Sequence, residues 1–223
     1  MKILALDTST EYCSIALSLD GELVSREVLA EQRHSELILP LLQRMLAETE
    51  MTLAQLDGIA FGAGPGSFTG LRIACGVTQG LAFGADLPVT GICTLEALAQ
   101  QTDGNNVITA IDARMGEIYH ASYIKTADGW QTASGPVLCL PQHAPLVTGG
   151  SWTGCGSGFS IYGETLRIRY EGCLSDILGN LRPHARDMVQ LAIPIFANGL
   201  GIDPADAVPL YIRNKVALKE KER

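Results

Sequence analysis

Apolar and polar positions alternate over the first thirty residues in the way that three successive β-strands require. Residues 2–7 form an apolar run that ends at Asp7, and residues 13–19 alternate with a period of two. The dipeptide Asp20-Gly21 then marks a tight turn into residues 22–30. The pattern predicts an antiparallel meander whose first strand ends in a carboxylate.

The same pattern returns in the second half of the chain. Residues 107–111 are apolar and lead to Asp112, residues 117–125 alternate, and Asp128-Gly129 marks another turn. A repeated unit of this kind indicates two similar α/β domains, although two β-meanders can also resemble each other by chance.

A polar run at residues 101–106 has the composition of a linker between the two units. We therefore expect a first domain over residues 1–103 and a second over residues 104–223. Whether the C-terminal tail packs back on the first domain is left open.

Helical periodicity follows the first meander. Over residues 35–49 one face of a predicted helix is apolar, and it consists of Leu37, Ile38, Leu41, Leu42, Met45 and Leu46. The chain then predicts a strand at residues 56–61, a helix at 70–84, a strand at 88–92 and a helix at 94–101. This order of elements is that of a ribonuclease H-like α/β fold. The second half fits less cleanly: short glycine-rich stretches occupy residues 148–158, and a helix is predicted near residues 183–198.

The predicted helix at residues 70–84 carries two rows of small residues. One row is Gly76, Gly80 and Gly84, and the other is Gly70, Ala74, Thr78 and Ala82. Each glycine inside a helix costs about 0.8–1 kcal/mol relative to alanine, so close packing against another backbone must compensate. A helix on a sheet needs only one small face, which favours an external partner for at least one row. Packing inside the chain is the alternative.

Two loops have the composition of a nucleotide site. A polar turn follows the first strand, where nucleotide-binding proteins of this architecture hold magnesium and phosphate. The glycine-rich loop at residues 62–70 stands between a strand and a helix, so its N–H groups could cradle an anion. The candidate residues are Asp7, Thr8, Ser9, Gly64 and Gly66. Ordinary turns that bond to their own backbone are the alternative reading of both loops.

The sequence lacks the residues that other enzyme classes would need at their active sites. A two-metal nuclease of this fold needs a carboxylate at the end of the strand at residues 56–61, and none stands there. The sequence contains no H-E-x-x-H and no G-x-S-x-G motif, and the loop at residues 62–70 is neither a P-loop nor a Rossmann fingerprint. We therefore disfavour a nuclease, a zinc protease and a serine hydrolase.

Composition indicates the cellular compartment and argues against contact with a membrane. The chain has 223 residues, 47% of them hydrophobic, yet no apolar stretch approaches the roughly 20 residues of a membrane span. Its six cysteines show no CxxC pair, which favours small apolar residues in a reducing compartment over a disulfide framework. We expect a cytoplasmic protein without membrane contact.

Charge is unevenly distributed. The net charge is -8, and residues 1–104 hold 13 acidic against 5 basic residues, whereas residues 105–223 hold 11 of each. An acidic first half repels a phosphate backbone, so we do not expect that half alone to bind nucleic acid. One segment is modestly basic, the tail at residues 215–223. Its simplest interpretation is a solvated helix end or a frayed terminus.

Several segments together resemble the TsaB (YeaZ) family. They are MKILALDTST at residues 1–10, HSELILPLL at 34–42, IAFGAGPGSFTGLRIACGVTQGLA at 59–82, IDARMGEIYHA at 111–121 and PLYIRNK at 209–215. The resemblance spans both halves, and its GPGSFTGLR and DARMGEIY segments are specific. It implies two actin-like (ASKHA) lobes, with a mixed five-stranded sheet flanked by helices in the first and a reduced copy in the second.

The resemblance also implies a role. Members of this family support TsaD, the catalytic paralogue that makes threonylcarbamoyladenosine (t6A) in tRNA, by pairing with it, alongside the ATPase TsaE. TsaD holds its metal with two histidines on the helix after the third strand, whereas this chain has His34 alone, with Ile38 four residues later. We therefore expect a non-catalytic subunit without a metal or a cofactor of its own, with ATP used by the complex and tRNA reached only through it.

The family is understood to dimerise through its first two helices. Carried over to this chain, the resemblance implies an interface, for the homodimer and for the TsaD-like partner, that contains Leu37, Leu41, Met45, Leu71, Gly76, Gly80 and Phe83. An autonomous actin-fold ATPase or small-molecule kinase that uses Asp7 and the loop at residues 62–70 is the alternative.

Overall fold

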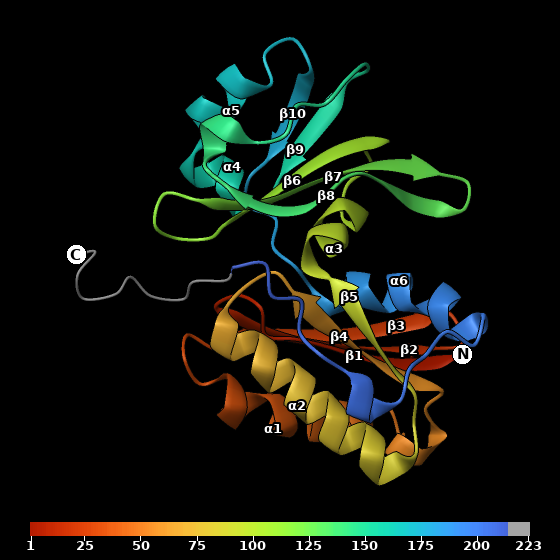
Figure 1. Cartoon of the computed structure of the whole chain (residues 1–223). Coiled ribbons are helices and arrows are strands. Elements are labelled where there is room, and N and C mark those ends of the chain that lie inside the picture. The colour runs from red at the N-terminus through yellow and green to blue at the C-terminus, as the bar shows by residue number, and fades with distance from the viewer. Residues whose placement is uncertain (214–223) are drawn as a thin grey trace.

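The computed structural model describes residues 1–213 and contains two mixed β-sheets of five strands each, stacked with helices between and outside them (Figure 1). The strand orders are β3-β2-β1-β4-β5 and β10-β9-β6-β7-β8. This is the two-lobed, actin-like architecture expected from the sequence. The basic tail at residues 215–223 lies outside the described residues.

The first sheet begins with the predicted meander. Its strands are β1 (Lys2–Asp7), β2 (Tyr12–Leu19), β3 (Glu22–Leu29), β4 (Gly58–Gly64) and β5 (Val89–Cys93). The first three strands are antiparallel neighbours, and β4 and β5 continue from β1 in parallel. The carboxyl ends of β1 and β4 therefore meet at one edge of the sheet, and this edge carries the Asp7 turn and the glycine-rich loop.

The second sheet repeats this connectivity. Its strands are β6 (Asn106–Asp112), β7 (Ile118–Thr126), β8 (Gly129–Cys139), β9 (Trp152–Cys155) and β10 (Leu174–Leu178), with the same antiparallel and parallel pairings. The second lobe has all five strands of the first, but fewer and shorter helices pack on its sheet. Where the 15-residue helix α1 (His34–Glu48) joins β3 to β4, only a short 3-10 turn (Pro141–His143) lies between β8 and β9.

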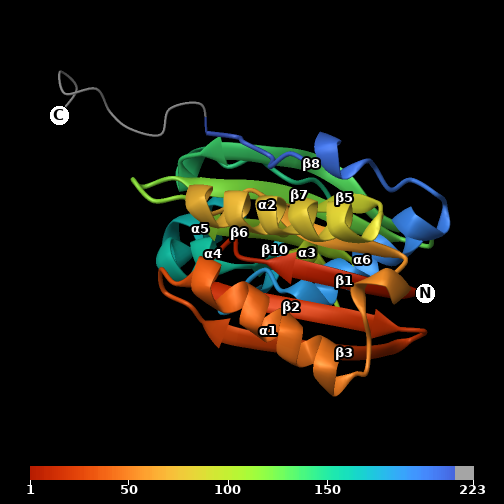
Figure 2. The same cartoon turned by 90° about the horizontal axis from the view of Figure 1, so that it is seen from below.

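Helices form the remaining layers. On the outer face of the first sheet α1 packs beside α2 (Phe68–Ala85), and the two helices face the viewer in Figure 2. Between the sheets lie α3 (Thr94–Gln100) and α6 (Ala185–Ala197), and α6 packs on the inner face of the first sheet although it comes from the end of the chain. The outer face of the second sheet carries α4 (Ser157–Ile161) and α5 (Gly163–Arg169).

The two small-residue rows of α2 lie on different sides of the helix. Gly70, Ala74, Thr78 and Ala82 are buried on the first sheet. Gly76, Gly80 and Gly84 are exposed, and a Cβ atom added at any of them would meet nothing within 4 Å. The first row therefore allows close packing inside the chain, whereas nothing within residues 1–213 packs on the second row to compensate for its glycines.

Beyond α6 the chain forms a strap, residues 199–213, that runs along α2 toward the second lobe (Figure 1). Ile202 exchanges two 2.9 Å backbone hydrogen bonds with Val89 at the free edge of β5. Farther along, the Leu210 N–H donates to the Ala63 carbonyl at 2.7 Å. The strap thus protects an edge strand and covers the end of β4.

Charged side chains join the lobes on two sides. At the end of the strap Arg213 donates to the Glu117 carboxylate at 2.7 Å, across the border of the lobes. At the other side Arg182 binds the Glu27 carboxylate through two nitrogens and stacks 3.8 Å from the ring centre of Tyr12. These contacts hold the lobes at both edges of the space between them.

The glycine-rich loop is shorter than the sequence suggested. The strand β4 continues to Gly64 and α2 begins at Phe68, so the irregular segment contains only residues 65–67 instead of 62–70. All six cysteines are free thiols. In the described part of the chain no helix is both long and apolar enough to cross a membrane.

The two rows of α2 predict opposite effects of the same substitution. Gly76→Ala should raise the free energy of unfolding by about 0.8–1 kcal/mol, because alanine favours the helix and the site is open. Gly70→Ala should lower it by about 2 kcal/mol or more, because the new methyl group would overlap the Thr8 carbonyl oxygen. Urea unfolding at low protein concentration measures both, and a gain from Gly70→Ala would contradict the packing described here.

Candidate functional site

The turn after β1 lies directly against the segment that joins β4 to α2. A Cβ atom at Gly66 would come 2.6 Å from the Ser9 carbonyl oxygen, and one at Gly70 would overlap the Thr8 carbonyl oxygen. A Cβ atom at Gly62 would instead overlap the side-chain carboxylate of Asp7. The structure therefore brings the predicted residues of the turn and the loop together. The turn and the loop are in direct contact, through backbone at Gly66 and Gly70 and through the Asp7 carboxylate at Gly62.

Polar groups of the turn bond to the protein itself. The Thr8 hydroxyl donates to the Gly70 carbonyl at 2.7 Å, and the Ser9 hydroxyl donates to the Asp7 carboxylate at 3.0 Å. The Ser67 N–H donates to the Ser9 carbonyl at 2.8 Å, and the Ser67 side chain caps α2. Asp7, Thr8 and Ser9 are each at most 3% exposed. In this arrangement the turn acts as a joint that fixes the start of α2.

Gly64, the fifth candidate residue, lies at the end of β4 with a left-handed φ of 117°. A Cβ atom there would approach the Leu210 carbonyl oxygen of the strap at 3.0 Å. The strap therefore covers the loop from the side of the second lobe. A cavity of about 50 Å³ remains at this border, lined by Pro65, Gly66, Phe68, Leu71, Tyr119, Leu210, Tyr211, Ile212 and Arg213.

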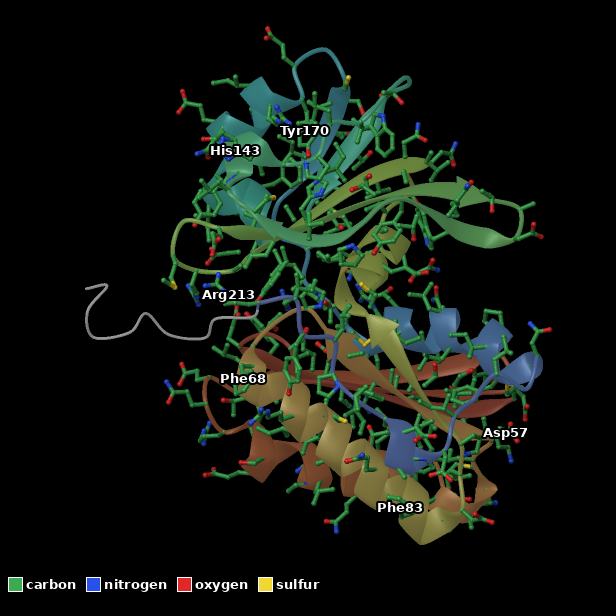
Figure 3. The ribbon with its side chains drawn as sticks, viewed as in Figure 1. Asp57, Phe68, Phe83, His143, Tyr170 and Arg213 are labelled. Carbon is green, nitrogen blue, oxygen red and sulfur yellow. The ribbon has the colours of Figure 1, made fainter. Side chains whose placement is uncertain are left out.

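A larger open hollow lies at the other end of the first lobe. It measures about 470 Å³ and is lined by Met1, Asp57, Pro88, Phe196, Gly199 and Gly201. Figure 3 labels Asp57 and Phe68 and shows them at opposite ends of this lobe. The hollow is therefore remote from the Asp7 turn.

Two buried carboxylates have perturbed acidity. Burial raises the pKa of Asp7 from 3.8 to about 6, although the hydrogen bonds from Ser9 lower it in part and Glu27 adds repulsion. Burial likewise raises the pKa of Asp187, in the first turn of α6, to about 6, with Arg186 opposing the shift. Both groups therefore carry an energetic penalty when they are ionised inside the folded protein.

His34 is buried at the start of α1, where one ring nitrogen lies 2.9 Å from the Thr10 carbonyl oxygen. Ile38, one turn later, is fully buried in the core of the first lobe. Within residues 1–213 no group of three histidine, cysteine or acidic side chains is arranged to hold a metal ion.

The second candidate region is the outer face of α1 and α2. Leu37 and Leu41 are half-buried against the core, Gly76 and Gly80 are exposed, and Phe83 is 61% exposed. These five residues belong to α1 and α2, the two helices that Figure 2 shows side by side on the outer face of the first lobe.

Met45 and Leu71, which were also expected at this interface, belong to the core instead. Met45 is completely buried and Leu71 is 2% exposed, so neither offers a surface. The helical pattern identified the apolar positions of α1 but did not distinguish those that face the sheet from those at its margin. Leu39, at 44% exposure, is an apolar surface residue that the prediction missed because it lies off the repeating stripe.

Comparison with known proteins gives a consistent result. The family model described as TsaD, tRNA N6-adenosine threonylcarbamoyltransferase, matches residues 27–149. A relative from Escherichia coli K12, named tRNA threonylcarbamoyladenosine biosynthesis protein TsaB, is 37% identical over 99% of this chain and 98% of its own length. The protein of the same name from Haemophilus influenzae is also 37% identical, over 99% and 97%.

Solved structures agree with these relatives. The structure described as YeaZ from Pseudomonas aeruginosa superposes with a TM-score of 0.87 at 37% identity, and it covers 94% of this chain and 99% of that one. A second structure, described as an uncharacterized Pseudomonas aeruginosa protein similar to the peptidase YeaZ, gives a TM-score of 0.88 at 36% identity and covers 95% and 99%.

The raised pKa of Asp7 predicts a pH-dependent penalty. Because the folded protein keeps this proton to higher pH than the unfolded chain, the contribution of Asp7 to stability falls between about pH 4 and pH 6. Asp7→Asn should therefore match the wild type near pH 4 and exceed its free energy of unfolding above pH 6, by up to ~3 kcal/mol for a shift of about two units. Urea unfolding across this pH range measures the difference. If the free energy of unfolding changes with pH in the same way in both proteins, Asp7 carries no ionisation penalty. Asp187 also has a raised pKa, but both proteins contain it, so it does not contribute to the difference between them.

Proposed function

Since this chain belongs to the TsaB family, whose members act in the biosynthesis of threonylcarbamoyladenosine in tRNA, we propose that it is a non-catalytic subunit of that pathway. In this role it is required for transfer of the threonylcarbamoyl group to the adenosine next to the anticodon of tRNAs that read codons starting with A. It acts in the cytoplasm by binding a TsaD-like catalytic subunit, together with a TsaE-like ATPase that uses ATP.

The exposed glycine row of α2 is the observation that carries this proposal. Gly76, Gly80 and Gly84 together weaken the helix by roughly 2–3 kcal/mol relative to alanine. Within residues 1–213 nothing lies within 4 Å of a Cβ atom added at any of them, and this supports a compensating contact with another molecule. The neighbouring Leu39 and Phe83 add exposed apolar surface to the same side of the lobe.

Similarity of fold supports a TsaD-like partner. The TsaD family model matches residues 27–149, a region that includes both α1 and α2. A paralogue built on the same two helices can pair with this face as a second copy of the chain would, and two helices from each molecule then form a four-helix interface. One surface accordingly serves the homodimer and the complex with the TsaD-like subunit.

The Asp7 turn supports a subunit better than an autonomous ATPase or kinase. Its hydroxyl groups and carboxylate are bonded to each other and to the backbone of the α2 segment, and the strap covers Gly64. A phosphate would have to displace these buried contacts. We therefore propose that this chain holds no nucleotide of its own and contacts tRNA only within the complex.

Gly80→Leu should abolish both self-association and binding of the TsaD-like subunit, weakening each by about a hundredfold or more, because the new side chain separates the two backbones. The monomer should keep its fold, since a Cβ atom at Gly80 meets nothing within 4 Å. Circular dichroism and isothermal titration calorimetry with the purified partner measure the two effects.

Gly163→Leu is the matched control for this experiment. Gly163 begins α5 on the second lobe and its Cβ position is equally open, so the same substitution there should leave binding unchanged. If Gly80→Leu folds and binds the TsaD-like subunit with wild-type affinity, the α2 face is not the docking surface.

A modification assay tests the non-catalytic role directly. With threonylcarbamoyl-adenylate and unmodified tRNA, the chain alone should form no t6A, and addition of the TsaD-like and TsaE-like proteins with ATP should restore its formation. Titration of the isolated chain with ATP should give no binding heat. Modified tRNA from the chain alone, or tight ATP binding by it, would favour the autonomous enzyme.

A further inference from the structure

An arginine and two aromatic rings form one cluster where the strap passes the start of α2. The guanidinium of Arg72 lies 3.9 Å from the ring centre of Phe68 and 5.8 Å from that of Tyr211. Its Nε atom donates to the Tyr211 hydroxyl at 2.9 Å, and the centres of the two rings are 5.5 Å apart. The cluster lies at the border of the two lobes, where Figure 3 labels Phe68 below Arg213.

This cluster belongs to the side of α2 that the strap covers. Gln79 follows Arg72 by close to two helical turns, so the two residues share one side of the helix. The amide of Gln79 donates to two carbonyl groups of the strap at 3.1 and 3.3 Å. Gly80 and Gly84 face a different side. The cluster is therefore separate from the docking function proposed for the exposed glycine row.

The outer edge of the guanidinium is free to bind a carboxylate. Within residues 1–213 the two terminal nitrogens of Arg72 donate to no protein atom, whereas Arg182 and Arg213 each bind a carboxylate there. An arginine held between aromatic rings loses little side-chain entropy when it forms an ion pair. Its planar edge is suited to a carboxylate, which it binds through two parallel hydrogen bonds.

A small apolar cavity adjoins the same two rings. Its volume is about 50 Å³, and Phe68 and Tyr211 form part of its wall together with Leu71, Tyr119 and Leu210. A space of this size is suited to a few carbon atoms, such as the end of an aliphatic side chain. Phe68, Leu210 and Tyr211 are each 39–44% exposed, so the cluster is accessible from solvent. The guanidinium and the cavity are thus both in contact with one exposed pair of rings.

The second lobe adds an exposed methionine to this border. In the turn between β6 and β7, Arg114, Met115 and Gly116 have left-handed φ angles of 63°, 57° and 78°. Residues other than glycine rarely adopt this conformation, so the turn is held in a strained form in which Met115 is 62% exposed. Arg213, which lines the cavity, donates to the Met115 sulfur at 3.2 Å and to the Glu117 carboxylate at 2.7 Å. Both lobes and the strap therefore contribute to one fixed surface.

We propose that this border is a docking site for an acidic segment of another protein, with a carboxylate bound by Arg72 and a neighbouring aliphatic side chain inserted in the cavity. Charge and shape both favour this occupant, because Arg72 has two unused donors and the cavity is apolar. Phe68, Met115 and Tyr211 supply the exposed aromatic and methionine surface that is enriched at protein interfaces. A nucleic acid is disfavoured, because residues 1–104, which include Arg72, hold 13 acidic against 5 basic residues. A segment that needs only one carboxylate meets less repulsion.

Binding of defined peptides to the purified chain tests the proposal. The capped peptide acetyl-Gly-Leu-Glu-Leu-Gly-amide places one carboxylate between two aliphatic side chains, and it should bind with a Kd of about 1 mM, since few contacts carry the binding. The same peptide with Gln in place of Glu, or with Gly in place of both Leu residues, should bind about tenfold more weakly. Titration followed by amide NMR signals measures the Kd and should shift the signals of Phe68, Met115 and Tyr211.

Substitutions on the chain locate the site. Arg72→Gln should weaken binding of the Glu peptide by about tenfold, because the charged planar edge is lost, and its amide spectrum should otherwise remain that of the folded protein. Arg167→Gln is the matched control, since Arg167 is an exposed arginine on α5 of the second lobe, and binding should not change. Gly80→Leu should also bind the peptide as the wild type does, so failure of this site and failure of the α2 docking surface are distinguishable.

Four outcomes would overturn the proposal. The Glu peptide gives no shifts at about 10 mM, or it binds no better than the Gln peptide. The peptide without leucine binds equally well, or Arg72→Gln retains the wild-type affinity. A short oligouridylate tests the other class of partner: if it binds more tightly than the peptide and Arg72→Gln abolishes its binding, the border is a nucleic-acid site and the proposal is likewise wrong.

Discussion

Close contact of Asp7 and the turn that follows it with the three glycines Gly62, Gly66 and Gly70 determines how the first lobe is built. A side chain at any of the three would collide with the turn, and the hydroxyl and carboxylate groups of the turn are bonded inside the same joint. The start of α2 is thereby fixed on β1, and the whole helix takes its orientation from that point. Because this contact fixes which side of α2 is buried, it also fixes which side of the helix is exposed to solvent.

The helix α2 has small residues on two different sides. Small residues on the buried side bring it close to its own sheet, and small residues on the exposed side leave an equally close approach open to a second chain. The strap adds a boundary to this surface by holding Tyr211 beside Arg72 and by connecting both to the second lobe through Arg213. The border of the exposed α2 surface and the arrangement of the two lobes therefore depend on one set of contacts.

Sequence reasoning predicted the elements whose pattern is local. Turn dipeptides and alternation gave the meanders of both sheets, and helical periodicity gave α1, α2 and α6 within a few residues. It missed β9, α4, α5 and β10, because a four-residue strand and a five-residue helix are too short to show a period. The interface implied by the family resemblance included Met45 and Leu71, which are buried, because neither a resemblance nor an apolar stripe shows which side chains of a helix face the neighbouring layer. The strap has no regular pattern, so its contacts with Ala63 and Glu117 appear only in three dimensions.

The position of α6 has a consequence for synthesis on the ribosome. The inner face of the first sheet, with Ile3, Ala5 and Ala16, is covered by Ala185, Met188, Ala192 and Phe196 of α6, which are translated after both sheets. A nascent chain that has completed β1 to β5 still exposes this apolar face, and the second lobe must be made before the cover arrives. The first half to emerge is thus the last to finish its core, so the growing chain depends on chaperones, or on rapid completion, to avoid aggregation.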